Sequence, residues 1–136
     1  MASQAPLPFD RLDFLYMPTA DVAAEVEHFT AVLGAQVVFA IEAFGARVAM
    51  VRMADGPPDV MFADHLDGER PILVYRVAAL DAAVEALKAR GWQDQPHFEI
   101  PHGPCVEFHT PAGHRIAIYE LTRPQVPERF AGRRDF

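Results

Sequence analysis

Residues 103–120, which read GPCVEFHTPAGHRIAIYE, decide the fold predicted for this chain. In the first half Val106 and Phe108 alternate with polar or small residues, and in the second half Ile116 and Ile118 do the same. The sequence TPAG between them is typical of a turn, because proline restricts φ and glycine permits a positive φ. Side chains alternate between the two faces of a strand. The stretch therefore predicts a β-hairpin with one apolar face, covered by a helix, and one mixed face, turned toward water, a cavity or a ligand.

The composition favours one globular domain in the cytoplasm. The chain has 136 residues, 51% of them hydrophobic, and a formal net charge of −7, which argues against a nucleic-acid partner. No apolar run approaches the roughly 20 residues that cross a bilayer, so no membrane partner is expected. The N-terminal sequence MASQAPLPFD lacks the basic and apolar regions of a secretory signal. The single cysteine, Cys105, excludes an internal disulfide and a multi-cysteine zinc site.

The pattern of strands and helices occurs twice, on either side of the break DGERP at 67–71. Before the break, periodicity predicts a strand, a helix and three strands, at 11–17, 22–33, 37–41, 46–52 and 60–63. After it, the pattern predicts a strand at 72–77, a helix from 80 that ends at Gly91, a short strand at 98–100 and the hairpin. A shift of 58 positions places Val22, Val26 and Phe29 of the first helix on Leu80, Val84 and Leu87 of the second.

We therefore predict an α+β fold built from two tandem β-α-β-β-β modules. The modules cover about 11–66 and 71–121, and neither is large enough to bury its sheet face alone. Together they form a single domain over 11–121. Residues 1–10 are a lead-in, and residues 122–136 are a C-terminal tail in which Phe130 and Phe136 are candidate anchors.

Three runs of sequence resemble the vicinal oxygen chelate superfamily, also called the glyoxalase/bleomycin-resistance/dioxygenase superfamily. They are HFTAVLG at 28–34, VAALDAAVEALKARG at 77–91 and FHTPAGHRIAIYE at 108–120. The last is similar to the family ending F-x-D-P-x-G-N-x-I-E-L, with Thr110 in place of Asp and His114 in place of Asn. The resemblance implies that the two modules form a cup-shaped mixed sheet with the helices outside. It also implies a homodimer, which many relatives form.

The resemblance also implies where a metal ion would bind. Metal-dependent members hold a divalent ion with a His on the first strand of each module and a Glu on the last strand. This chain has Phe14 and Ile72 at the two His positions, Ala117 at the Glu position and Met61 at the equivalent position of the first module. None of these side chains is a ligand for a hard metal ion. We therefore expect no metal and no cofactor.

Strand alternation assigns a set of residues to the face opposite the helices, and these are the candidate ligand-binding residues. Apolar and aromatic side chains with a few polar ones are typical of a small-molecule pocket, although filling of the core is the alternative. The set is Phe14, Tyr16, Met61, Ile72, Val74, Arg76, Cys105, Glu107, His109, Ala117 and Tyr119. The same alternation places Asp13 on the other face.

The polar members of this set have two readings each. Glu107 and His109 form an acid–base pair in one reading, and in the other Glu107 forms a structural ion pair with Arg115 across the hairpin. Arg76 holds a ligand carboxylate or pairs with Glu107 or the tail.

The other polar candidates have mainly structural readings. Cys105 is a small inert hydrophobe. His102 and His114 are surface loop residues, and Glu120 is a carboxylate at the rim of the cup.

The function expected from these residues is metal-independent binding of a small aromatic or amphipathic molecule. This is similar to the sequestering, bleomycin-resistance-like branch of the superfamily. One alternative is a metal-dependent lyase or dioxygenase with a displaced site that includes Glu107 and His109. Another is an interaction module with a closed cup. Whether the protein is an enzyme, and what its catalytic residues are, stays open at this stage.

Overall fold

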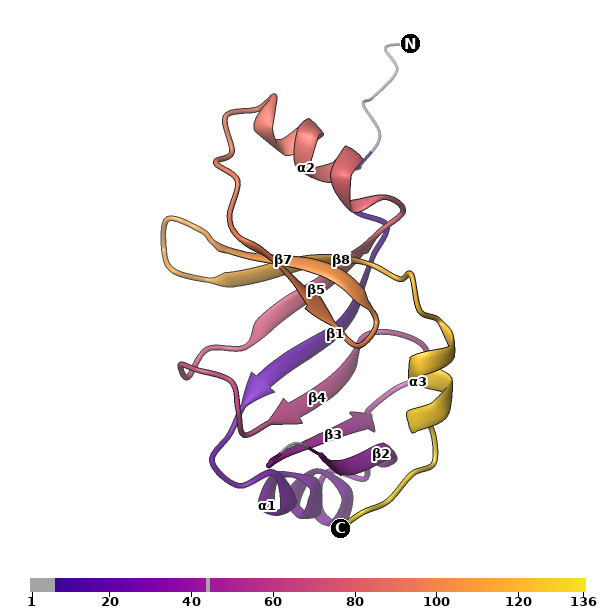
Figure 1. The fold of residues 1–136 in the computed structure, drawn as a ribbon. Coiled ribbons are helices and arrows are strands. Elements are labelled where there is room, and N and C mark those ends of the chain that lie inside the picture. The colour runs from indigo at the N-terminus through magenta and orange to yellow at the C-terminus, as the bar shows by residue number, and fades with distance from the viewer. Residues whose placement is uncertain (1–6, 44) are drawn as a thin grey trace.

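A computed structural model describes residues 7–43 and 45–136 and has the predicted α+β architecture (Figure 1). The first module contains β1 (Arg11–Pro18), α1 (Val22–Glu27), β2 (Gln36–Ala43), β3 (Ala46–Arg52) and β4 (Asp59–Ala63). The second contains β5 (Ile72–Val77), α2 (Leu80–Lys88), β6 (His97–Ile100), β7 (Gly103–His109) and β8 (Arg115–Glu120). The predicted helix at 22–33 is α-helical only to Glu27 and continues as a π-helical turn, η1 (His28–Val32).

All eight strands form one mixed sheet in the order β2-β3-β4-β1-β5-β8-β7-β6. In each module the first strand pairs in parallel with the last, and β1 joins β5 antiparallel at the centre. Phe14 pairs with Val74 and Tyr16 pairs with Ile72. The shift of 58 positions places Phe14 on Ile72 and Tyr16 on Val74, so these two pairs are equivalent. The two modules are therefore related by an approximate two-fold axis between β1 and β5. The prediction of two tandem modules is thereby confirmed.

Helices α1 and α2 each cover one module on the same, outer face of the sheet (Figure 1). Val22 and Val26 of α1 are buried against Phe62 and the β2–β3 side chains. Leu80 and Val84 of α2 are buried against Val106 and Ile118, the apolar face of the predicted hairpin. No helix of the described residues is both long enough and apolar enough to span a bilayer.

The N-termini of the two helices are capped in different ways. The Asp21 side chain accepts a hydrogen bond from the Ala24 N–H (3.0 Å), as its N-cap position suggested. Residue Ala79 gives α2 no such cap, and the Leu80 N–H donates instead to the carboxylate of Glu120 at the end of β8 (2.8 Å). Glu120 therefore joins the hairpin to the helix that covers it.

The opposite, concave face of the sheet carries one buried apolar cluster that extends across both modules. It contains Phe14, Phe39, Ile41, Met61, Ile72, Val74, Cys105, Ala117 and Tyr119. All the apolar and aromatic residues of the candidate binding set belong to this cluster, except Tyr16, which packs against it. The alternation of the strands thus placed these residues on the correct face.

The C-terminal residues add a short helix, α3 (Gln125–Phe130), that the sequence analysis did not predict. Proline is tolerated at a helix start, where its missing N–H would have no intrahelical partner, so Pro124 and Pro127 do not prevent this helix. Phe130 packs against Phe39 of the concave cluster, with ring centroids 5.6 Å apart. Beyond it, residue 134 bridges to Ala40 and covers the outer edge of β2.

The start of β7 generates a stability prediction. A Cβ atom at Gly103 would lie 2.0 Å from the carbonyl oxygen of Glu120 and 2.9 Å from the Thr122 hydroxyl. Gly103→Ala therefore requires the backbone at residue 103 to move away from the end of β8. We expect it to lower the free energy of unfolding by about 3 kcal/mol. Gly91→Ala is the control, because that glycine has a positive φ and open space around it and should lose only about 1 kcal/mol. Urea denaturation gives both values, and equal losses would contradict the prediction.

Candidate functional site

A β-bulge in β1 turns an aspartate toward the concave face. The pairing of β1 with β5 shifts from Leu12–Tyr75 to Phe14–Val74, so Asp13 is an extra residue with no opposite partner. Its side chain is buried, with 8% of the residue exposed. The alternation assumed in the sequence analysis placed Asp13 on the helix face, and this was wrong, because an inserted residue resets the alternation.

The carboxylate of Asp13 is held by donors from three strands. Oδ1 accepts from Nε of Arg11, and Oδ2 accepts from Nε of Arg76 (2.8 Å) and from the hydroxyl of Tyr119. A buried carboxylate is tolerated only with such partners. The partner of Arg76 is therefore Asp13, and not Glu107 or the tail as one reading had suggested.

Burial raises the pKa of two further groups on this face, Tyr119 and Cys105. Burial, and then the hydrogen bond to Asp13, raises the pKa of Tyr119 to about 12, so the phenol stays a donor. Burial, and then the charge of Glu107, raises the pKa of Cys105 to about 12. The Cys105 thiol is therefore protonated near neutral pH and poorly nucleophilic.

His102 also belongs to the concave face. Its ring lies beside those of Phe14 and Tyr119, with centroids 6.2 and 6.0 Å away. The backbone carbonyl of His102 accepts from the N–H groups of Thr122 and Arg123 (3.1 and 3.0 Å), which ties the β6–β7 turn to the chain after β8. The prediction that His102 is a surface loop residue was wrong, because this pairing turns the ring inward.

The imidazole of His102 is unusual in its surroundings. Its Nδ1 atom is buried and has no hydrogen-bond partner among the described residues. Burial lowers the pKa of His102, so the ring is neutral near neutral pH. The neutral ring therefore adds flat surface to the concave face, while its Nδ1 is closed to solvent.

These groups surround a cavity of about 250 Å³, which we call the Asp13 cavity. Apolar walls come from Phe14, Met50, Leu121 and two prolines, one in the β3–β4 turn and one in α3. The polar lining includes Arg11, Asp13, Arg76, His102, Tyr119 and the Arg52–Asp59 ion pair. It is an apolar recess with a few convergent polar groups, which is the usual composition of a small-molecule site.

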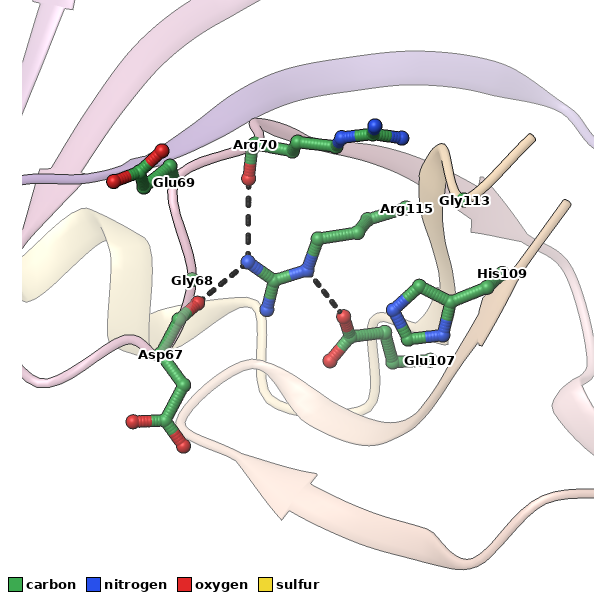
Figure 2. A pocket seen from close by; sticks show the side chains of 8 residues that line it. All are labelled: Asp67, Gly68, Glu69, Arg70, Glu107, His109, Gly113 and Arg115. Carbon is green, nitrogen blue, oxygen red and sulfur yellow. Dashed lines mark hydrogen bonds and ion pairs between the residues drawn. The ribbon is translucent and has the colours of Figure 1, made fainter.

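A second, wider cavity of about 530 Å³ lies at the other end of the concave face (Figure 2). We call it the hairpin cavity, because it lies between the linker that joins the modules and the β7–β8 hairpin. Arg115 donates to the Glu107 carboxylate (2.8 Å) and to the carbonyls of Asp67 and Arg70 (2.6 and 3.2 Å). Arg70 donates in return to the carbonyl of Ala112 (2.7 Å).

These contacts decide between the two readings of Glu107. The ion pair with Arg115 is present, so the Glu107 carboxylate is used to hold the hairpin to the linker. His109 lines the same cavity and is exposed. His114 is exposed in the turn, as predicted.

The candidate binding residues are thus divided into three groups. Phe14, Arg76 and Tyr119 line the Asp13 cavity, and Glu107 and His109 line the hairpin cavity. The remaining six lie in the apolar cluster between the two cavities and line neither of them: Tyr16, Met61, Ile72, Val74, Cys105 and Ala117. The middle of the cup is filled by side chains.

The positions that the family resemblance assigns to metal ligands do not suit a metal ion. Phe14, Met61, Ile72 and Ala117 lie on the four central strands, and each is at most 5% exposed inside the apolar cluster. They offer no carboxylate or imidazole. In the part of the chain that the structure describes, no three His, Cys, Asp or Glu side chains gather as a metal site would require.

Comparison with solved structures supports the expected fold. Methylmalonyl-CoA epimerase from Mycobacterium tuberculosis superposes with a TM-score of 0.72 at 19% identity, over 90% of this chain and 95% of that one. A variant of the Streptomyces coelicolor methylmalonyl-CoA epimerase, in complex with 2-nitronate-propionyl-CoA, gives 0.67 at 17% identity, over 85% and 96%. These epimerases belong to the vicinal oxygen chelate superfamily. The present chain has that superfamily's fold.

A hypothetical protein from Bacillus halodurans C-125 also has this fold, with a TM-score of 0.67 at 11% identity, over 81% of this chain and 93% of that one. No family model matches the sequence, and no curated protein matches it. Similarity at such identities establishes the fold alone. The chemistry of this chain has to be argued from its own side chains.

The hydrogen bond between Tyr119 and Asp13 gives a prediction. Tyr119→Phe removes one donor from a buried carboxylate, and a hydrogen bond to a charged group contributes about 2 kcal/mol, so the free energy of unfolding should fall by about that amount. Tyr75→Phe, on the helix face of β5, is the matched control and should cost less than about 0.5 kcal/mol. Chemical denaturation measures both. A Tyr119→Phe variant as stable as the control would mean that this bond contributes nothing.

Proposed function

We propose that this protein binds a small amphipathic molecule in the Asp13 cavity and does so without a metal ion. The observation that supports this most directly is the convergence of Arg76, Tyr119 and the ring of His102 on an apolar recess. A pocket with this composition provides burial for an apolar body and a small number of bonds that orient it. One solved structure of this fold is a methylmalonyl-CoA epimerase in complex with methylmalonyl-CoA and NH4+, so the fold accommodates a small-molecule ligand.

The size and lining of the cavity limit the ligand. A volume of about 250 Å³ lies below the roughly 300–1,000 Å³ typical of drug-sized ligands. The rings of Phe14, His102 and Tyr119 lie within contact distance of one another on one wall. A planar aromatic group packs well on such a wall. A single-ring compound, or the end of a longer amphipathic molecule, is the ligand that we propose.

The alternatives from the sequence are less well supported. A displaced metal site built on Glu107 and His109 requires the Glu107 carboxylate, which is already paired with Arg115. The interaction module with a closed cup has one observation in its favour, since the middle of the cup is filled. It differs from our proposal in that no small molecule would bind at the Asp13 end.

A cavity-filling variant tests the proposal. Leu121→Trp adds bulk to a wall of the Asp13 cavity, so binding of aromatic fragments found by ligand-observed NMR should weaken by about tenfold or more. Val32→Trp is the control, because Val32 is 68% exposed and lies on η1, outside the cavity. It should leave binding unchanged. Thermal denaturation checks that both variants fold. Equal binding by the two variants, or no fragment binding to the wild type, would contradict the proposal.

We also propose a homodimer that forms through β6. The tail covers the β2 edge of the sheet through the bridge at Ala40, whereas β6 is the outermost strand at the other edge. Phe98 on β6 is 45% exposed. An open strand edge with an exposed aromatic residue is a favourable surface for pairing with a second copy.

Light scattering tests the dimer. The wild type should give about twice the chain mass of 15.1 kDa, and Phe98→Glu should give the monomer, because a charge on each copy opposes the pairing of the edges. Val32→Glu, which changes a more exposed apolar residue away from β6, should remain dimeric. A wild-type mass near 15 kDa at all concentrations, or a dimer that survives Phe98→Glu, would contradict this interface.

A further inference from the structure

The charge of the Asp13 cavity is opposite to that of the protein. The chain carries a formal net charge of −7, yet three arginines and two aspartates line this cavity. Arg52 and Asp59 satisfy each other through two contacts of 3.2 Å. The excess positive charge is therefore located on Arg11 and Arg76, which share the single carboxylate of Asp13.

Arg76 has hydrogen-bonding capacity that Asp13 does not use. Its contact with Asp13 involves Nε alone, and a guanidinium has five N–H donors in a planar fork. The four donors on the terminal nitrogens remain for the Tyr119 oxygen and for a ligand. The Arg76 side chain is 31% exposed and lines the cavity. Asp13 holds this guanidinium in place from one side, so its other edge is preorganised for an anion.

The other walls fit a molecule that has an anionic end and an apolar body. Phe14, Met50 and Leu121 provide apolar surface. The ring of His102 lies beside that of Phe14 and extends the aromatic wall.

We infer that the ligand of the Asp13 cavity is a small organic acid with an aromatic or aliphatic body, whose carboxylate binds the free edge of Arg76. This inference rests on the proposed function and specifies its ligand class. A carboxylate matches the planar fork of a guanidinium with two parallel hydrogen bonds. The excess of arginine disfavours cations. The small volume and the apolar walls favour a compact acid over a highly charged phosphate ester.

Matched pairs of acids and amides test the inference. Benzoate, phenylacetate and hexanoate are each compared with the corresponding primary amide, which has nearly the same shape and no charge. Isothermal titration calorimetry or ligand-observed NMR measures the affinity for the wild-type protein. At least one acid should bind about tenfold or more tightly than its amide, because charge-assisted bonds to arginine exceed neutral ones.

Variants then locate the source of the preference. Arg76→Gln should remove the difference between acid and amide, whereas Arg47→Gln should retain it. Arg47 is the control because its guanidinium stacks over the Phe136 ring, 4.5 Å from the centroid, outside the Asp13 cavity. Arg76→Lys keeps a positive charge without the planar fork and should keep part of the preference. If Arg76→Gln does not fold, Arg76→Lys replaces it as the test of Arg76. The comparison of acids with amides on the wild-type protein requires no variant.

The possible failures are distinguishable. Acids and amides that bind equally, or amides that bind better, would overturn the carboxylate inference and leave ligand binding in the cavity intact. The carboxylate inference is also overturned, with ligand binding intact, if no acid binds but other fragments bind the wild type and fail to bind Leu121→Trp. A preference for acids that survives Arg76→Gln would overturn the assignment of Arg76. Absence of all fragment binding would mean that the proposed function itself is wrong.

Discussion

The buried carboxylate of Asp13 is the interaction on which this end of the structure depends. It lies at the join between the two modules, where β1 meets β5, and it receives donors from Arg11, Arg76 and Tyr119 on β1, β5 and β8. Loss of one partner of a fully buried pair costs about 3–5 kcal/mol. Here the two arginine side chains are 51% and 31% exposed, so solvent screening reduces that value. The bonds still fix the direction of Arg76 and keep Tyr119 as a donor, and these two groups shape the cavity.

The filled middle of the cup follows from the residues at its centre. At the positions that the family resemblance assigns to metal ligands, this chain has Phe14, Met61, Ile72 and Ala117. Full burial of a large apolar side chain stabilises the folded state by about 1.5–3 kcal/mol. These side chains are accordingly buried together with Phe39, and Phe130 of α3 packs against them. The centre of the concave face therefore contributes to stability. The two cavities lie at the ends of this face, where the lining becomes polar.

Much of the fold was predictable because it depends on periodicity. The hairpin, the two outer helices and the repeat at 58 positions follow from apolar residues that recur at strand or helix spacing, and the register of β1 with β5 agrees with them. The bulge at Asp13 was not predictable in this way, because an inserted residue leaves the local composition unchanged. One signal was present: Arg76 falls on an apolar face, and a charge there requires a buried partner. The inward turn of His102 and the helix α3 depend on contacts between distant segments, which no local pattern records.

The two cavities show how similar residue types serve different purposes. In the hairpin cavity Arg115 already bonds to Glu107 and to two linker carbonyls, and Arg70 bonds to the carbonyl of Ala112. These arginines are used to hold the linker against the hairpin. In the Asp13 cavity one aspartate is shared by two arginines, and the buried Nδ1 of His102 has no partner in the described chain. The terminal N–H groups of Arg76, whose side chain is 31% exposed, are not used by Asp13 and can bind water or a ligand. That difference, more than the size of either cavity, is the reason that we propose the Asp13 end as the ligand-binding site.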